Sequence, residues 1–153
     1  MALIVQKYGG TSVGDLNRIR NVAHRVARTR QEGNRVVVVV SAMSGETDRL
    51  IQLAHQASDN PELREYDSLI STGEQVSAAL LAITLQSLGV PAKSFLGPQL
   101  RIVTDSAFST ARIQKVEGSA HLARASPWAP DARRAAWDSL RRRKLPSRTT
   151  LGR

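Results

Sequence analysis

Five consecutive valines, at positions 36–40 within RVVVVVSAMSG (35–45), constrain the fold of this 153-residue chain more than any other feature. β-Branched side chains favour strands, and an unbroken apolar run predicts a strand that is covered on both faces. Strands of this kind are typical of parallel sheets, whose crossover connections place helices on the faces of the sheet. We therefore expect an α/β domain.

Strand and helix patterns alternate around the valine run. The apolar run LIVQKY (3–8) comes before a segment with helical spacing at 15–33, which Gly33 would end. Helical spacing returns at about Thr47, and again from Leu63 to about Leu88 with an interruption near Gly73. Further strands are predicted at 92–97, 101–105 and 111–116. This order predicts an α/β fold with a mostly parallel sheet.

The net charge of +9 is concentrated at the carboxyl end. Residues 1–118 hold 13 Lys+Arg and 11 Asp+Glu, whereas residues 119–153 hold 9 and 2. The second segment is rich in Arg, Ala and Pro and lacks Val, Ile, Phe and Tyr, so we expect it to be irregular or to form one short helix at 131–145. The predicted division is a domain at 1–118 and a basic tail at 119–153.

Composition also limits the class of protein. The absence of cysteine excludes disulfides and thiolate metal ligands, and we assign no metal-binding side chain. With no apolar run of membrane-spanning length and no signal-peptide pattern, we expect a cytoplasmic protein without a membrane partner. A basic nucleic-acid-binding protein that uses the arginines and two tryptophans of the tail is an alternative. No nucleic-acid-binding fold is recognisable, so we expect no specific nucleic-acid partner.

The stretch VQKYGGTSVG (5–14) places a lysine and two glycines between the first strand and the following helix. Gly9 and Gly10 allow a tight turn with converging N–H groups, and the helix adds the positive end of its dipole. Lys7 can supply a full positive charge to phosphoryl oxygens. The order of residues differs from a Walker A loop, because no Lys-Ser or Lys-Thr pair follows the last glycine. A packing turn is the alternative interpretation.

Hydroxyl residues also follow the valine strand, and Glu74 lies at a predicted helix start in LISTGEQVSAALLA (69–82). Ligands of open parallel sheets bind at the carboxyl ends of the strands, so Lys7, Ser41 and Thr47 are expected to converge on one edge. Each residue has an alternative role. Ser41 and Thr47 would serve as helix caps, and Glu74 as a first-turn acid that the helix dipole favours.

Five motifs resemble the amino-terminal part of bacterial aspartokinase, from residue 1 to about 118: KYGGTSVG, VVVVSAMSGETD, STGEQVSAALLA, GVPAKSF and TDSAFSTARI. The resemblance implies an incomplete three-layer α/β/α fold of the amino-acid kinase type. It also implies transfer of the γ-phosphoryl group of MgATP to the side-chain carboxylate of L-aspartate. The product is 4-phospho-L-aspartate, made in the first step of lysine, threonine and methionine biosynthesis. An amino-acid kinase with another carboxylate substrate is the nearest alternative.

The same resemblance implies roles for individual residues. The nucleotide would be bound by Lys7, Tyr8, Gly9, Gly10, Ser12 and Ser41, with Lys7 also catalytic. L-Aspartate would be bound by Ser41, Thr47, Glu74 and Arg153, with Glu74 at its ammonium group and Arg153 at its α-carboxylate. ATP and Mg²⁺ are the implied cofactors. The attacking carboxylate needs no general base, so positioning and charge stabilisation would carry the rate.

The final residues, TTLGR (149–153), match a later motif of the family at about the expected distance, although the sequence between is missing. We interpret the tail as a reading frame lost near Ser119 and regained near Thr149, with coincidence as the alternative. The resemblance then implies that the rest of the kinase domain and the regulatory part, through which the family dimerises, are absent. We expect the isolated chain to have little or no kinase activity.

Overall fold

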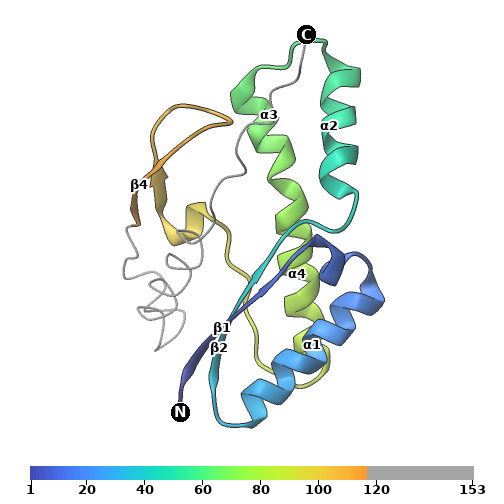
Figure 1. Cartoon of the computed structure of the whole chain (residues 1–153), viewed down its shortest axis with the longest axis vertical. Coiled ribbons are helices and arrows are strands. Elements are labelled where there is room, and N and C mark those ends of the chain that lie inside the picture. Colours follow the sequence, from blue (N-terminus) through green and yellow to red (C-terminus); the bar gives the residue numbers. More distant parts are fainter. Residues whose placement is uncertain (117–153) are drawn as a thin grey trace, which may run out of the picture.

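The computed structural model describes residues 1–116 (Figure 1). In chain order its elements are β1 (Leu3–Tyr8), the 3₁₀ helix η1 (Gly10–Val13), α1 (Leu16–Gln31), β2 (Arg35–Val40), α2 (Glu46–Ala57), α3 (Leu63–Ile70), α4 (Thr72–Ser87), the 3₁₀ helix η2 (Pro98–Leu100), β3 (Ile102–Thr104) and β4 (Ile113–Val116). The α/β class is therefore confirmed. The predicted basic tail, with its short helix, lies outside the described residues.

The described strands form two separate pairs. β1 and β2 are parallel, from Leu3 opposite Arg35 to Tyr8 opposite Val40. β3 and β4 are antiparallel, with an irregularity in register between Val103 and Thr104. Within residues 1–116 the parallel arrangement thus holds for the first pair alone.

The strand predicted at 92–97 is wrong, because this segment is irregular up to the turn that begins η2. Two of its backbone groups bond to side chains instead of to a neighbouring strand. The carbonyl of Ala92 accepts a hydrogen bond from Gln86 Nε2 at 2.8 Å. The N–H of Leu96 donates to Gln99 Oε1 at 2.8 Å. The apolar run therefore forms no strand here, since nearby side chains bond to two of its backbone hydrogen-bonding groups.

The helix ends follow local signals in the sequence. α1 begins after Asp15, whose carboxylate accepts a hydrogen bond from the N–H of Arg18 at 2.8 Å. It ends just before Gly33, whose φ of 83° favours glycine. α3 and α4 are separated by Ser71, which keeps helical angles (φ −63°, ψ −15°). The interruption predicted near Gly73 is therefore a single residue, Ser71.

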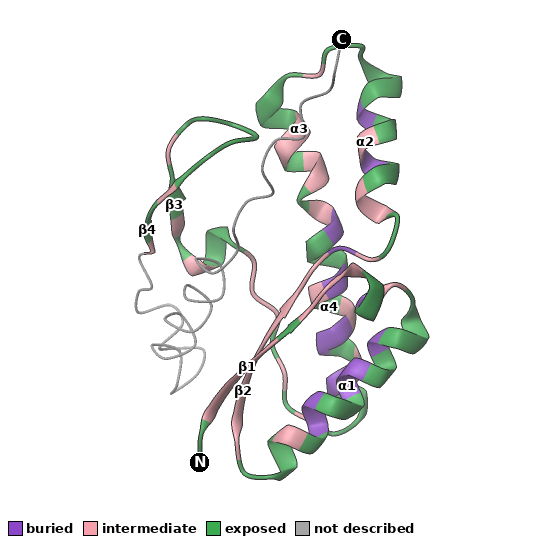
Figure 2. Cartoon of the chain, viewed as in Figure 1, coloured by how far each residue is buried: buried purple, intermediate pink, exposed green. Residues whose placement is uncertain are grey.

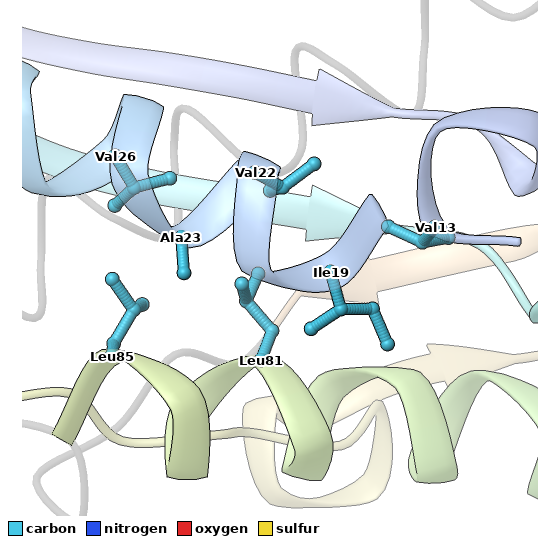
Figure 3. Packing of buried hydrophobic residues seen from close by; sticks show 7 residues of the cluster. All are labelled: Val13, Ile19, Val22, Ala23, Val26, Leu81 and Leu85. Atoms are coloured by element: carbon cyan, nitrogen blue, oxygen red, sulfur yellow. The ribbon is translucent and has the colours of Figure 1, made fainter. Parts of the chain in front are cut away.

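Because Ser71 stays helical, α3 and α4 form one 25-residue stretch, Leu63–Ser87, with a mean hydropathy of 1.3 in its most apolar window. By length and composition alone this stretch could cross a membrane, which differs from the expectation drawn from the sequence. The core helices of globular proteins pass the same test. Leu81 and Leu85 of this stretch belong to the buried cluster that α4 shares with α1 (Figure 3).

The core lies between α1 and α4 on one face of the parallel strands (Figures 2 and 3). Its buried side chains are Val13, Ile19, Val22, Ala23, Val26, Leu81 and Leu85. Tyr8 and alternate valines of β2 pack against this cluster. Strand alternation then places Lys7 on the opposite face. All six residues of β2 are half-buried, so the cover predicted on both faces is incomplete within the described residues.

Candidate functional site

The carboxyl ends of β1 and β2 lie side by side, because the two strands are parallel and end together at Tyr8 and Val40. The segments that follow them are in direct contact. The N–H of Ser41 donates to the carbonyl of Tyr8 at 3.2 Å. A Cβ built on Gly10 would lie 3.2 Å from the carbonyl oxygen of Ala42. Only a residue without a side chain fits this approach comfortably.

Lys7 lies beside the glycine turn. Its side chain is exposed, and its Nζ is 3.3 Å from the position that a Cβ on Gly9 would occupy. The turn therefore offers an ammonium group and backbone with no Cβ to obstruct an anion. This arrangement fits a phosphate group, which needs positive charge and a close approach to the backbone.

The 3₁₀ helix η1 is held in place on both sides. The N–H of Ser12 donates to the carbonyl of Gly9 at 2.9 Å, and Val13 is fully buried in the core. Arg18 Nη1 donates to the carbonyl of Thr11 at 2.6 Å, which ties the turn to α1. The sequence pattern gave no signal for this contact, because seven positions separate the two residues.

Tyr8 has its side chain on the core side of the sheet, away from Lys7. Its hydroxyl donates to Gln6 Oε1 at 3.0 Å, and Gln6 Nε2 donates to Thr29 Oγ1 of α1 at 2.9 Å. Burial raises the pKa of the Tyr8 hydroxyl above its ordinary value of 10.0, and the charge of Arg25 opposes that shift. At the glycine turn Tyr8 therefore presents its main chain and not its hydroxyl.

The start of α4 reaches the segment after β2. Glu74 Oε1 accepts a long hydrogen bond of 3.4 Å from the N–H of Ala42. Gly73 is buried at the same point, where a Cβ would lie 2.9 Å from Ala42 Cβ and 3.5 Å from Glu46 Cγ. The carboxylate predicted from the STGE motif is thus brought next to the residue that follows Ser41.

Thr47 lies half-buried in the first turn of α2. Its neighbour Glu46 bonds Arg49 twice, with Nη2 to Oε1 at 2.7 Å and Nε to Oε2 at 2.9 Å. The hydrogen bond from Arg49 lowers the pKa of Glu46 below its ordinary value, although burial opposes the shift. Ala42, Glu46 and Gly73 therefore pack together at one junction. Each is adjacent in sequence to one of the candidate site residues Ser41, Thr47 and Glu74. Arg153 lies outside the described residues.

Comparison with known proteins identifies the family. The family model described as the amino acid kinase family matches residues 2–124. The chain belongs to the amino acid kinase family. Its relatives within that family include curated aspartate kinases.

The chain is 59% identical over 117 residues to an aspartate kinase of Stutzerimonas stutzeri. It is 55% identical over 116 residues to an aspartokinase of Thermus thermophilus. Each match covers 76% of this chain, but only 28% and 29% of the two relatives. This member of the amino acid kinase family thus spans less than a third of the length of those proteins.

Solved structures confirm the amino acid kinase fold. An aspartate kinase from Synechocystis matches with a TM-score of 0.54 and 59% identity, over 56% of this chain and 15% of that chain. E. coli aspartokinase III, solved in complex with aspartate and ADP, matches with a TM-score of 0.68 over 86% of this chain and 39% of that chain. At 21% identity, the second likeness shows the fold alone.

Proposed function

We propose that this chain carries the phosphate-binding turn and part of the aspartate-binding surface of a cytoplasmic aspartate kinase. The observation that carries the proposal is the contact between the two segments that follow β1 and β2, through Tyr8 with Ser41 and Gly10 with Ala42. This contact brings the turn beside Lys7 together with the segment that leads to Thr47. The identity to relatives named aspartate kinases supports the choice of substrate.

The nucleotide would bind at the glycine turn. Lys7, the backbone of Tyr8–Gly10, Ser12 and Ser41 would hold its phosphates, since the turn combines an exposed ammonium group with glycines that leave room for an anion. Mg²⁺ would come with ATP and neutralise charge on the phosphate oxygens. Residues 1–116 contain no cluster of three or more His, Asp or Glu side chains that could hold a metal ion.

L-Aspartate would bind where β2, α2 and α4 meet. Glu74, exposed in the first turn of α4, would receive its ammonium group in a charge-assisted contact. The hydroxyls of Ser41 and Thr47 would bind its oxygens. Arg153 would bind the α-carboxylate.

The reaction balances without proton transfer. A side-chain carboxylate oxygen of L-aspartate attacks the γ-phosphorus of ATP, and the bond from that phosphorus to the β,γ-bridging oxygen breaks. The products are 4-phospho-L-aspartate and ADP. Lys7 would stabilise the charge on the transferring group, and the glycine turn would fix its position.

The first test is ligand binding by the ¹⁵N-labelled 153-residue chain, followed by NMR. Binding is the readout because the chain spans 28% of a typical relative. L-Aspartate should shift the amide signals of Ala42 and Glu74. A non-hydrolysable ATP analogue with Mg²⁺ should shift those of Gly9 and Gly10. Glu74→Gln keeps an acceptor for the Ala42 N–H but removes the charge. It should therefore weaken L-aspartate binding about tenfold or more while leaving nucleotide binding unchanged.

Matched ligands serve as controls. D-Aspartate and sodium chloride at the same ionic strength should leave the Ala42 and Glu74 signals in place. Equal or stronger shifts with L-glutamate would indicate an amino acid kinase with another substrate. An absence of shifts at saturating L-aspartate would contradict the proposed function for this chain.

A further inference from the structure

Gly73 lies where three separate elements pack together. It is buried in the first turn of α4, and a Cβ built on it would lie 2.9 Å from Ala42 Cβ. The same Cβ would lie 3.5 Å from Glu46 Cγ and 3.5 Å from Leu50 Cδ1, both in α2. The first distance is too short for two carbon atoms, whereas the other two are ordinary contacts.

Two of the three contacts of Gly73 are next to a candidate ligand-binding residue, and so is Gly73 itself. Ala42 follows Ser41, Glu46 precedes Thr47, and Gly73 itself precedes Glu74. The separation of the three elements at this junction therefore sets the separation of those three side chains. The bond from the Ala42 N–H to Glu74 Oε1 is already long, at 3.4 Å, so a small displacement would break it.

We propose that Gly73 is a positioning residue, whose missing side chain sets the distance between Glu74 and the Ser41–Ala42 segment for binding of L-aspartate. This inference depends on the proposed function, because it concerns the same site.

A methyl group at position 73 would disturb the site before it disturbed the fold. α4 is fixed further along by Leu81 and Leu85, which are buried against α1 (Figure 3). The helix therefore cannot move away as a rigid body without opening that core. The displacement would fall on the first turn of α4 and on the segment after β2, which carry Glu74 and Ser41.

The test uses three variants of the full chain: Gly73→Ala, Ala42→Gly, and the two combined. Gly73→Ala should weaken L-aspartate binding about tenfold. Its affinity for the ATP analogue should fall much less, because Ser41 is the one proposed nucleotide-binding residue in the displaced segment and the glycine turn itself does not contact position 73. Removing the Ala42 methyl takes away the atom that clashes, so the double variant should recover L-aspartate affinity to within about twofold of the parent. Gly97→Ala is the control, since a Cβ at Gly97 meets nothing within 4 Å.

Two results would overturn the inference. One is L-aspartate affinity in Gly73→Ala equal to that of the parent. The other is a loss that the added Ala42→Gly change does not restore, since the close approach to Ala42 Cβ would then not be its cause.

A second readout separates this inference from the proposed function. Amide hydrogen exchange at residue 42 reports the bond to Glu74 whether or not a ligand binds. If the parent chain fails to bind L-aspartate, the proposed function is wrong. Exchange that is slow in the parent, faster in Gly73→Ala and slow again in the double variant would still establish that Gly73 positions Glu74. Unchanged exchange in Gly73→Ala would refute that role.

Discussion

Asp67 of α3 binds Ser109, 42 positions further along the chain, through both of its carboxylate oxygens. The N–H of Ser109 donates to Oδ2 at 2.6 Å, and its hydroxyl donates to Oδ1 at 2.9 Å. Ser109 has a φ of 61°, a left-handed conformation that serine adopts at a cost. Figure 1 shows the connection between β3 and β4 reaching toward α3. These bonds therefore tie the β3–β4 hairpin to the helices and hold a strained turn.

Replacing Asp67 with alanine should release this turn. Both bonds are lost and the left-handed Ser109 is no longer supported, so local opening should become easier by about 1 kcal/mol. Amide hydrogen exchange at Ser109 should then be roughly fivefold faster. The control is Asp59→Ala, which removes an exposed carboxylate between α2 and α3. Equal exchange in both variants would show that other contacts hold the hairpin turn.

The hairpin should also loosen in acid because of Asp105. The N–H of Arg112 donates to its carboxylate and lowers its pKa below 3.8, with further donors in Ala107 and Gln114. A carboxyl with a lowered pKa in the folded state stabilises that state above its unfolded pKa, and the stabilisation is lost as pH falls through the folded pKa. Hydrogen exchange of the Arg112 backbone amide should therefore be slow near pH 5 and faster below pH 3.8, after correction for the intrinsic exchange rates.

Asp105→Asn tests that assignment. The asparagine cannot ionise, so exchange at Arg112 should lose this pH dependence and stay at the faster rate. If the variant and the parent change together with pH, another carboxyl controls the hairpin.

Two isoleucines on the packed helices should differ sharply in their contribution to stability. Ile19 of α1 is fully buried, whereas Ile83 of α4 is 60% exposed. Ile19→Ala should lower the free energy of unfolding by about 2–5 kcal/mol, because it leaves a cavity in the core. Ile83→Ala should cost under about 1 kcal/mol, since alanine is also the better helix former. Urea unfolding measures both. A similar cost at the two positions would mean that the outer face of α4 is covered in solution.

Gly33 is needed for its backbone conformation and not for space. Its φ is 83°, and a Cβ there would meet nothing within 4 Å. Gly33→Ala should therefore destabilise the chain by about 1 kcal/mol through backbone strain alone. Gly33→Asn should cost less, because asparagine tolerates left-handed angles better. Equal thermal midpoints for the two variants would contradict this explanation.

Local features of the sequence predicted most of the elements. The valine run is a strand, and Asp15 and Gly33 bound the first long helix. The strands predicted at 101–105 and 111–116 form at 102–104 and 113–116, although they pair antiparallel and not in a parallel sheet. Each of these depends on neighbours within a few positions, which a single sequence contains. The strand predicted at 92–97 is wrong, because two backbone groups of this segment bond to side chains and not to a neighbouring strand.

Contacts between residues far apart in the chain were harder to predict from the sequence. The predicted convergence of Lys7, Ser41 and Thr47 on one edge followed from the parallel-sheet rule, and the structure brings the segment that begins at Ser41 into contact with the glycine turn. No sequence pattern indicated that the Tyr8 side chain packs on the core face, that Gly73 approaches Ala42, or that Asp67 binds Ser109. Each depends on how distant elements pack, which periodicity and motifs do not record. The roles of the individual site residues stay predictions.

The close approach of Gly73 to Ala42 also makes these two positions depend on each other in evolution. Alanine is the better residue in a helix by about 1 kcal/mol, so selection for heat resistance would favour it at position 73. That substitution becomes acceptable only after position 42 has lost its own methyl group. The order of the two changes therefore matters. If Ala42→Gly comes first, Gly73→Ala can follow without a clash. If Gly73→Ala comes first, the intermediate protein binds L-aspartate less tightly. Lineages of this family that carry alanine at position 73 should carry glycine at position 42.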